Sequence, residues 1–123
     1  MHTILVVGAG NLGSRYIQGL SKYNESLSII VLDINEGALK LSQKRWAEAS
    51  GNFSAHSISW FTDFIDINVP IDICIIATTS PGRADLVRYV NGKVQPRFWI
   101  IEKVLSQSTR ELDLIGNATD KAE

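Results

Sequence analysis

The stretch that most constrains the fold is ILVVGAGNLGSRY at 4–16, where four apolar residues run into three glycines and a polar, helix-compatible segment. Gly8, Gly10 and Gly13 fit the spacing G-x-G-x-x-G, between a predicted strand and a predicted helix. In that setting the first glycine permits a tight turn, the second lets backbone approach a pyrophosphate, and the third lets the helix pack closely on the strand. The alternative is a plain glycine-rich turn that binds nothing.

Beyond this loop, short apolar runs alternate with longer amphipathic segments, which is the pattern of an α/β domain with a parallel sheet. Strands are expected at 3–7, 27–33, 56–61, 71–79 and 97–103. Helices are expected at 11–23, 35–51, 80–92 and 108–122, and 62–68 is expected as a single helical turn or an irregular loop. Right-handed crossovers then give the doubly wound strand order 3-2-1-4-5. We therefore predict a single Rossmann-type, dinucleotide-binding domain over 1–123.

Charge narrows the class of protein further. Lys and Arg number 12 against 13 Asp and Glu, and this near-balance argues against a nucleic-acid partner, which usually selects a basic excess. It does not favour an anionic membrane surface, and no apolar run approaches the roughly 20 residues of a membrane span. The charged segment LKLSQKR at 39–45 is expected as a solvent-exposed helix face.

Cysteine and histidine usage gives no sign of a disulfide or a metal site. The only cysteine, Cys74, cannot form an internal disulfide, so a reducing compartment and a cytoplasmic location are expected. Cys74 lies mid-strand and is expected as a buried core thiol. His2 and His56 are isolated and lack metal-ligand spacing, so no metal is predicted.

An acidic residue supports a nucleotide at the loop. Asp33 lies 20 residues after Gly13, at the end of the second predicted strand. A carboxylate there can bind both hydroxyls of an adenosine ribose but would repel a 2′-phosphate, and no arginine follows at Ile34 or Asn35, so NAD is favoured over NADP. The alternative role for Asp33 is the N-cap of the next helix. The cofactor contacts predicted in this half are Gly8, Ala9, Gly10, Asn11, Leu12, Gly13, Asp33 and Ile34.

The other candidate binding and catalytic residues lie at the ends of the fourth and fifth predicted strands. Thr78, Thr79 and Ser80 are small and polar and lie where doubly wound folds bind ligands, suited to a ribose or nicotinamide. Alternatively, they cap the next helix. Glu102 and Lys103 stand where the fifth strand should emerge beside the fourth, and a lysine there can hold a substrate hydroxyl and assist proton transfer.

Together with the glycine loop, the segments VLDIN, DICIIATTSPGRADLV and IIEKVLSQS resemble the nucleotide-binding half of the Gfo/Idh/MocA oxidoreductases, relatives of glucose-fructose oxidoreductase and inositol dehydrogenase. That family carries a glycine loop, an acidic residue after strand 2, an "aTPnxxH"-like stretch after strand 4 and "EKP" after strand 5. The resemblance implies NAD-dependent hydride transfer with a small-molecule sugar or polyol. It also implies that Lys103 is the catalytic residue contacting the substrate hydroxyl, that Glu102 lies near the nicotinamide, and that Thr78 matches the threonine of "TP".

The chain also departs from the family pattern. Thr79 and Arg83 stand where the family often has proline and histidine, and Arg83 is expected as an ordinary exposed helix arginine rather than a phosphate ligand. Val104 replaces the proline of "EKP", so we expect a trans peptide bond before it. The family's C-terminal substrate domain, which also supplies the usual dimer interface, has no counterpart in this chain. NAD(H) binding with little or no turnover by this chain alone is therefore expected.

Two other classes use similar motifs. An NAD-sensing regulatory module, like the ligand-gating domains of potassium transport systems, shares the glycines and the acidic residue but has no reason to carry Glu102 and Lys103. An S-adenosylmethionine methyltransferase usually lacks the third glycine in this register and has a seventh, antiparallel strand, for which no segment is seen.

Overall fold

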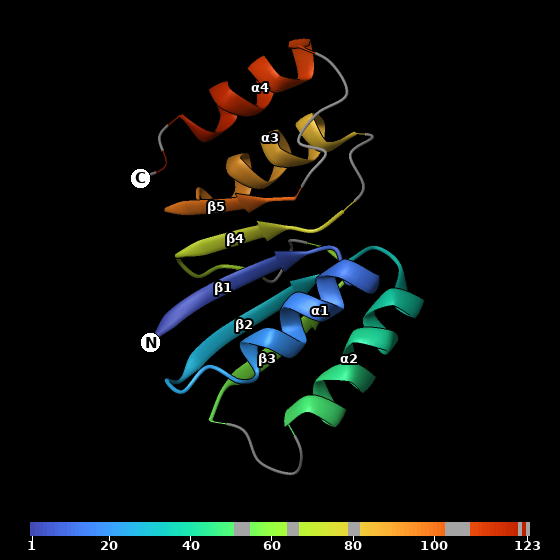
Figure 1. Cartoon of the computed structure of the whole chain (residues 1–123). Helices are drawn as coiled ribbons and strands as arrows, with labels where there is room; N and C mark the ends of the chain where they lie inside the picture. Colours follow the sequence, from blue (N-terminus) through green and yellow to red (C-terminus); the bar gives the residue numbers. More distant parts are fainter. Residues whose placement is uncertain (51–54, 64–66, 79–81, 103–108, 121, 123) are drawn as a thin grey trace.

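The computed structural model describes residues 1–50, 55–63, 67–78, 82–102, 109–120 and 122 (Figure 1). In these ranges the strands are β1 (His2–Val7), β2 (Leu27–Leu32), β3 (Ser57–Phe61), β4 (Ile73–Ile76) and β5 (Phe98–Ile101). All pairings are parallel and the order is β3-β2-β1-β4-β5, which confirms the predicted doubly wound topology. The helices are α1 (Asn11–Leu20), α2 (Glu36–Ser50), α3 (Arg83–Val94) and α4 (Thr109–Thr119).

Alternating side chains divide the core into two layers, because successive residues of a strand point to opposite faces of the sheet. On one face, Ile4 and Val6 of β1 pack with Ile17 of α1 and with Leu39 and Trp46 of α2. The neighbouring strand residues Leu5 and Val7 belong to the other layer, which takes in Val87 of α3 and Ile115 of α4. Figure 1 shows α1 and α2 over β1, β2 and β3, with α3 and α4 at the β4–β5 side. The inner strands β1, β2 and β4 are thus largely covered from both sides, as their nearly continuous apolar sequences predict, whereas the edge strands β3 and β5 have exposed positions.

Element ends differ from the prediction for local reasons. Helix α1 ends at Leu20 instead of 23, where Lys22 N–H bonds the carbonyl of Gly19 in a tighter turn and Ser21 Oγ bonds the carbonyl of Gln18. Helix α3 begins at Arg83 instead of 80, because Gly82 has a φ of +74°, which is not helical. Of the segment expected as a turn or loop, 62–63 and 67–68 contain no helix, and 64–66 lie outside the described residues.

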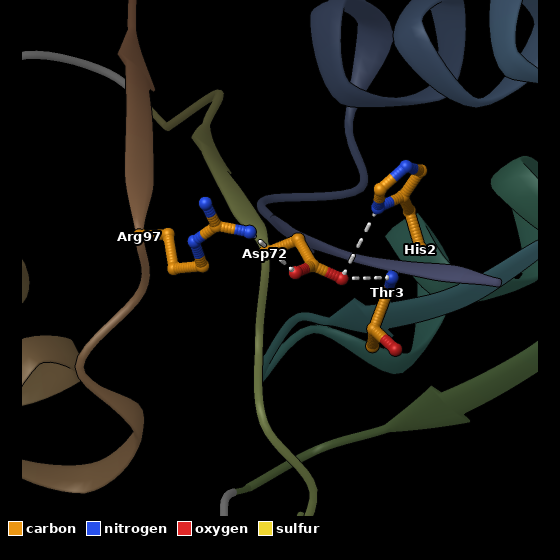
Figure 2. Close-up of polar contacts among 4 residues, drawn as sticks. All are labelled: His2, Thr3, Asp72 and Arg97. Carbon is orange, nitrogen blue, oxygen red and sulfur yellow. Dashed lines mark hydrogen bonds and ion pairs between the residues drawn. The ribbon is translucent and has the colours of Figure 1, made fainter. Parts of the chain in front are cut away.

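At the amino end of the sheet, Asp72 joins β1 to the segment that enters β5 (Figure 2). Its Oδ2 accepts the N–H of Thr3 at 2.8 Å and lies 3.7 Å from Nδ1 of His2. Its Oδ1 lies 3.7 Å from Nη1 of Arg97. The Thr3 hydrogen bond, with the positive charge of His2 and Arg97, holds the pKa of Asp72 below its ordinary value, against a smaller opposing effect of burial. This cluster lies at the opposite end of the strands from the glycine loop.

Cys74 is buried as predicted. Trp46 is also buried, whereas Trp60 and Trp99 are half-buried. Burial raises the pKa of the Cys74 thiol, which makes it unreactive as a nucleophile at neutral pH. None of the helices described is long and apolar enough to cross a membrane.

Candidate functional site

The three glycines of the loop meet three different surroundings. Gly8 has a φ of +99°, and a Cβ there would lie 3.0 Å from atoms of Ala77 and Thr78. A Cβ on Gly13 would lie 1.7 Å from the carbonyl oxygen of Gly8, so helix α1 can approach the loop only without one. A Cβ on Gly10 would meet nothing within 4 Å. The fold therefore requires glycine at 8 and 13, while at 10 it leaves open space beside the backbone.

The loop is held by the strand and helix that follow it. The N–H of Gly8 bonds the carbonyl of Leu32 in β2 at 2.8 Å, and the N–H of Ala9 bonds Oδ2 of Asp33 at 2.8 Å. From α2, the buried hydroxyl of Ser42 donates to the carbonyl of Ala9 at 2.7 Å. Both polar groups of the Ala9 backbone are thus fixed, and the loop is preorganised.

The N-terminus of α1 opens directly above this loop. The first intrahelical bond runs from Ser14 N–H to the carbonyl of Gly10 at 2.9 Å, so the three preceding N–H groups have no partner within the helix. The cap residue Gly10 offers no side chain, and the first turn holds no acidic residue. Arg45 of α2 adds positive charge, donating to the carbonyl of Asn11 at 3.2 Å and to Oγ of Ser14. This helix end favours an anion.

Asp33 lies at the end of β2, as predicted, but it does not cap α2. The cap is Asn35, whose Oδ1 accepts the N–H of Ala38 at 3.1 Å. Asp33 instead receives the N–H of Asn35 on Oδ1 at 2.8 Å and that of Ala9 on Oδ2. A carboxylate has about four acceptor positions, so two backbone bonds leave it capacity for ribose hydroxyls. The capping alternative for Asp33 is therefore wrong.

A cavity of about 320 Å³ lies beside Asp33, over the carboxyl ends of the strands. It has the size of a small-ligand pocket. Four of its residues were predicted cofactor contacts: Gly8, Asp33, Ile34 and Thr78. The other lining residues come from β1, β2, the end of β3 and α3: Val7, Leu32, Thr62, Asp63, Leu86 and Tyr89. Ile34, which lines the cavity, is 90% exposed.

Arg83 is 1% exposed, so the expectation of an ordinary surface arginine is wrong. Its guanidinium donates to the carbonyl of Thr78 at the end of β4 and to the carbonyl of Glu102 after β5. It therefore joins the two strand ends predicted to face a nicotinamide. Burial lowers its pKa, although an arginine remains charged at neutral pH. Thr78 Oγ1 is buried and has no hydrogen-bond partner among the residues that the structure describes.

Among the remaining predicted contacts, Asn11 and Leu12 are exposed at the start of α1, and Glu102 is half-buried. The N–H of Glu102 bonds the carbonyl of Ile76 at 3.2 Å, so it lies beside the end of β4 as expected. Three predicted residues, Thr79, Ser80 and Lys103, lie outside the described residues.

The sequence analysis did not predict two residues of α2 that stabilise the site, Ser42 and Arg45. Ser42 and Arg45 fall in the segment expected as a solvent-exposed helix face, yet both contact the loop or α1. Their i, i+3 spacing places them on one face of α2, and this spacing is the sequence signal that could have identified them. Asp63 and Tyr89 line the cavity only because the sheet order brings β3 and α3 to it.

Comparison with known proteins finds the same fold. No protein-family model matches the sequence, and no curated protein matches it significantly. Among solved structures, a Gfo/Idh/MocA family oxidoreductase from Vibrio cholerae superposes with a TM-score of 0.72 at 18% identity, covering 98% of this chain and 36% of its own. The WlbA dehydrogenase from Bordetella pertussis, in complex with NADH and UDP-GlcNAcA, gives 0.66 at 17% identity, covering 97% and 34%. A myo-inositol dehydrogenase from Corynebacterium glutamicum gives 0.62 at 21% identity, covering 99% and 35%.

The chain thus spans about a third of the length of these structures. At identities of 17–21% the matches establish the shared fold. The expected likeness to the nucleotide-binding half of the Gfo/Idh/MocA oxidoreductases is confirmed at the level of that fold.

Proposed function

We propose that this chain is the NAD(H)-binding domain of a Gfo/Idh/MocA-like oxidoreductase that acts on a sugar or polyol. The observation that carries the proposal is the glycine loop. The packing requires glycine at 8 and 13, but position 10 opens onto empty space, at a helix N-terminus without a side-chain capping hydrogen bond. Open space beside the backbone at a helix N-terminus suits a pyrophosphate that approaches the backbone closely.

Asp33 supports a dinucleotide without a 2′-phosphate. Its carboxylate borders the cavity and is held by two backbone N–H groups. In this position it would accept hydrogen bonds from the adenosine ribose hydroxyls and repel a phosphate on the same ribose. NAD is therefore the proposed cofactor.

The opposite half of the site would hold the nicotinamide, which supplies the hydride acceptor or donor. Thr78 lines the cavity, and its buried hydroxyl has no hydrogen-bond partner among the residues that the structure describes. Arg83 binds the backbone carbonyls of both Thr78 and Glu102. Thr79, Ser80 and Glu102 remain predicted cofactor contacts. Lys103, after Glu102 in sequence, remains the predicted catalytic residue. It would hold the substrate hydroxyl and move its proton during hydride transfer.

Two of the structural matches support a sugar-like substrate, since one is a myo-inositol dehydrogenase and the other contains UDP-GlcNAcA. Because those chains are about three times longer, hydride transfer is proposed for a protein in which a substrate domain joins this one. This chain alone should bind NADH in the cytoplasm with little turnover.

Isothermal titration calorimetry with NADH, NADPH and S-adenosylmethionine tests the proposal. We expect NADH to bind more tightly than NADPH, and S-adenosylmethionine not to bind. Asp33→Asn should weaken NADH binding by about tenfold and narrow its advantage over NADPH, since the charged acceptor is lost. Glu36→Gln, which removes an exposed charge from the first turn of α2 outside the cavity lining, is the matched control and should change neither affinity. A preference for NADPH, or binding of S-adenosylmethionine alone, would contradict the proposal.

A further inference from the structure

Arg83 is the largest fully buried side chain among the residues that the structure describes, and it is charged. It is the first residue of α3 and follows Gly82, whose φ is +74°. Figure 1 shows α3 at the β4–β5 side of the sheet. Burial of a charged group is unfavourable unless the fold gives that group hydrogen-bond partners. The partners of Arg83 therefore indicate why an arginine stands here.

Two partners of Arg83 lie where the pairing of β4 with β5 ends. Among the described residues, the final backbone bond between these strands runs from the N–H of Glu102 to the carbonyl of Ile76 at 3.2 Å. In a continued parallel ladder, the N–H of Thr78 would next bond the carbonyl of Glu102. The guanidinium of Arg83 takes that place, since it donates to the carbonyls of both Glu102 and Thr78. One side chain thus links the two strand ends beyond the last backbone bond.

The shape of the guanidinium suits this link. It is planar and offers five N–H donors in a fixed geometry, so it can bind two carbonyls at once and hold them at a set separation. A lysine ammonium is a point charge on a flexible chain and lacks that geometry. Arg83 has further interactions in the fold, which the number of its donors allows. It therefore fixes the backbone at Thr78 relative to the backbone at Glu102.

The two residues held in this way lie at the carboxyl ends of their strands. Thr78 lines the cavity, and its buried Oγ1 has no hydrogen-bond partner within the described part of the chain. Glu102 is half-buried and directly follows β5. Doubly wound folds bind ligands at this edge, next to the switch between β1 and β4. A ligand group bound there would meet Thr78 and Glu102 at positions that Arg83 sets.

We propose that Arg83 is a positioning residue, which holds the ends of β4 and β5 so that Thr78 and Glu102 can bind the nicotinamide ring of the cofactor. Because Arg83 is only 1% exposed, it acts through the backbone of these two residues and not by contacting the cofactor. This inference rests on the proposed function, in which Thr78 and Glu102 are cofactor contacts. Loss of Arg83 should then weaken binding of the nicotinamide and leave binding of the adenosine and the pyrophosphate unchanged.

The test compares NADH with ADP-ribose, which keeps the adenosine, the pyrophosphate and the second ribose but has no nicotinamide. Calorimetry on the whole chain, under conditions where circular dichroism shows each variant to be folded, gives the ratio of the two dissociation constants. A general loss of folded protein weakens binding of both ligands equally, so a change in this ratio reports on the nicotinamide alone. We expect the wild type to bind NADH about tenfold more tightly than ADP-ribose.

Arg83→Met should bring the two dissociation constants within about twofold of each other, while that of ADP-ribose stays within about twofold of its wild-type value. Arg83→Lys keeps the charge but loses the planar donor geometry, so its ratio should fall to about threefold. This second variant carries the test if Arg83→Met does not fold. Arg88→Met, which removes an exposed arginine from the same helix, is the matched control and should keep the wild-type ratio.

A wild-type ratio in the Arg83 variants, or an equal loss of affinity for the two ligands, overturns the positioning role and leaves the proposed function standing. Equal binding of NADH and ADP-ribose by the wild type overturns the role as well, since the nicotinamide then adds nothing to binding. Binding of neither ligand by the wild type would contradict the proposed function and this inference together.

Discussion

At the scale of single residues, the loop separates glycines that the fold needs from the one that a ligand would need. Gly13 touches the Gly8 carbonyl so closely that any side chain would displace α1. Gly10 has extended backbone angles, φ −70° and ψ −153°, and no neighbour in the direction of a Cβ. Substitution with alanine therefore tests the stability of the fold at Gly13 and ligand binding at Gly10.

Gly13→Ala should lower the free energy of unfolding by about 3 kcal/mol or more, because the new methyl group overlaps buried backbone. Gly10→Ala should change it by less than about 1 kcal/mol, while weakening NADH binding by about tenfold through crowding of the pyrophosphate. Urea denaturation followed by circular dichroism, with calorimetry for NADH, measures both. Equal stability of the two variants would show that the helix can yield at Gly13.

The sequence was sufficient to predict where these glycines and Asp33 lie, because their places follow from the strand–loop–helix pattern. It was not sufficient for Arg83. An arginine on a helix, with no acidic residue at a helical spacing, is expected to be exposed. Arg83 is buried because it binds backbone carbonyls at the ends of two strands, which the fold brings together. The same holds for Asp63, which reaches the cavity through sheet order alone.

At the scale of elements, Arg83 links α3 to the ends of β4 and β5. Arg83→Met should lower the free energy of unfolding by about 2–4 kcal/mol, because the carbonyls of Thr78 and Glu102 lose a charged donor in a buried setting. Denaturant titration checks this. Arg88→Met, a substitution of an exposed arginine on the same helix, serves as the reference and should cost less than about 0.5 kcal/mol. Similar losses of unfolding free energy in both variants would mean that Arg83 contributes no more to stability than a surface residue does.

The Asp72 cluster links β1 to the approach of β5, at the other end of the strands. Because the pKa of Asp72 in the folded protein lies below its ordinary value of 3.8, the folded state favours the ionised form. This contribution to stability is complete above the unfolded-state pKa of about 3.9 and is lost as pH falls through the lower, folded-state pKa.

Asp72→Asn should therefore be less stable than the wild type by about 1 kcal/mol at pH 7, since it loses a charged acceptor for Thr3. The difference should hold down to about pH 5 and shrink below pH 4. Urea unfolding at a series of pH values measures it. A difference that stays constant through the acid range would argue that ionisation of Asp72 does not stabilise the fold.

At the scale of the whole molecule, the strand order decides what the carboxyl edge can bind. Apolar periodicity and turn residues were enough to predict β3-β2-β1-β4-β5, because parallel strands with right-handed crossovers leave few arrangements. That order aligns the glycine loop, Asp33 and Asp63 on one side of the switch between β1 and β4, and Thr78 and Glu102 on the other. Helix bounds were less predictable, since they depend on single backbone angles such as that of Gly82.

NADH is proposed to lie across this edge with its pyrophosphate at the start of α1. A ¹H–¹⁵N NMR titration of the uniformly labelled chain with NADH tests it most directly. We expect saturable shifts at the amides of Asn11, Leu12 and Gly13, together with those of Asp33, Ile34 and Asp63, and none at Asp72 at the opposite end of the sheet. Saturable binding that leaves the amides of Asn11 to Gly13 unmoved, or the absence of any saturable shift, would contradict it.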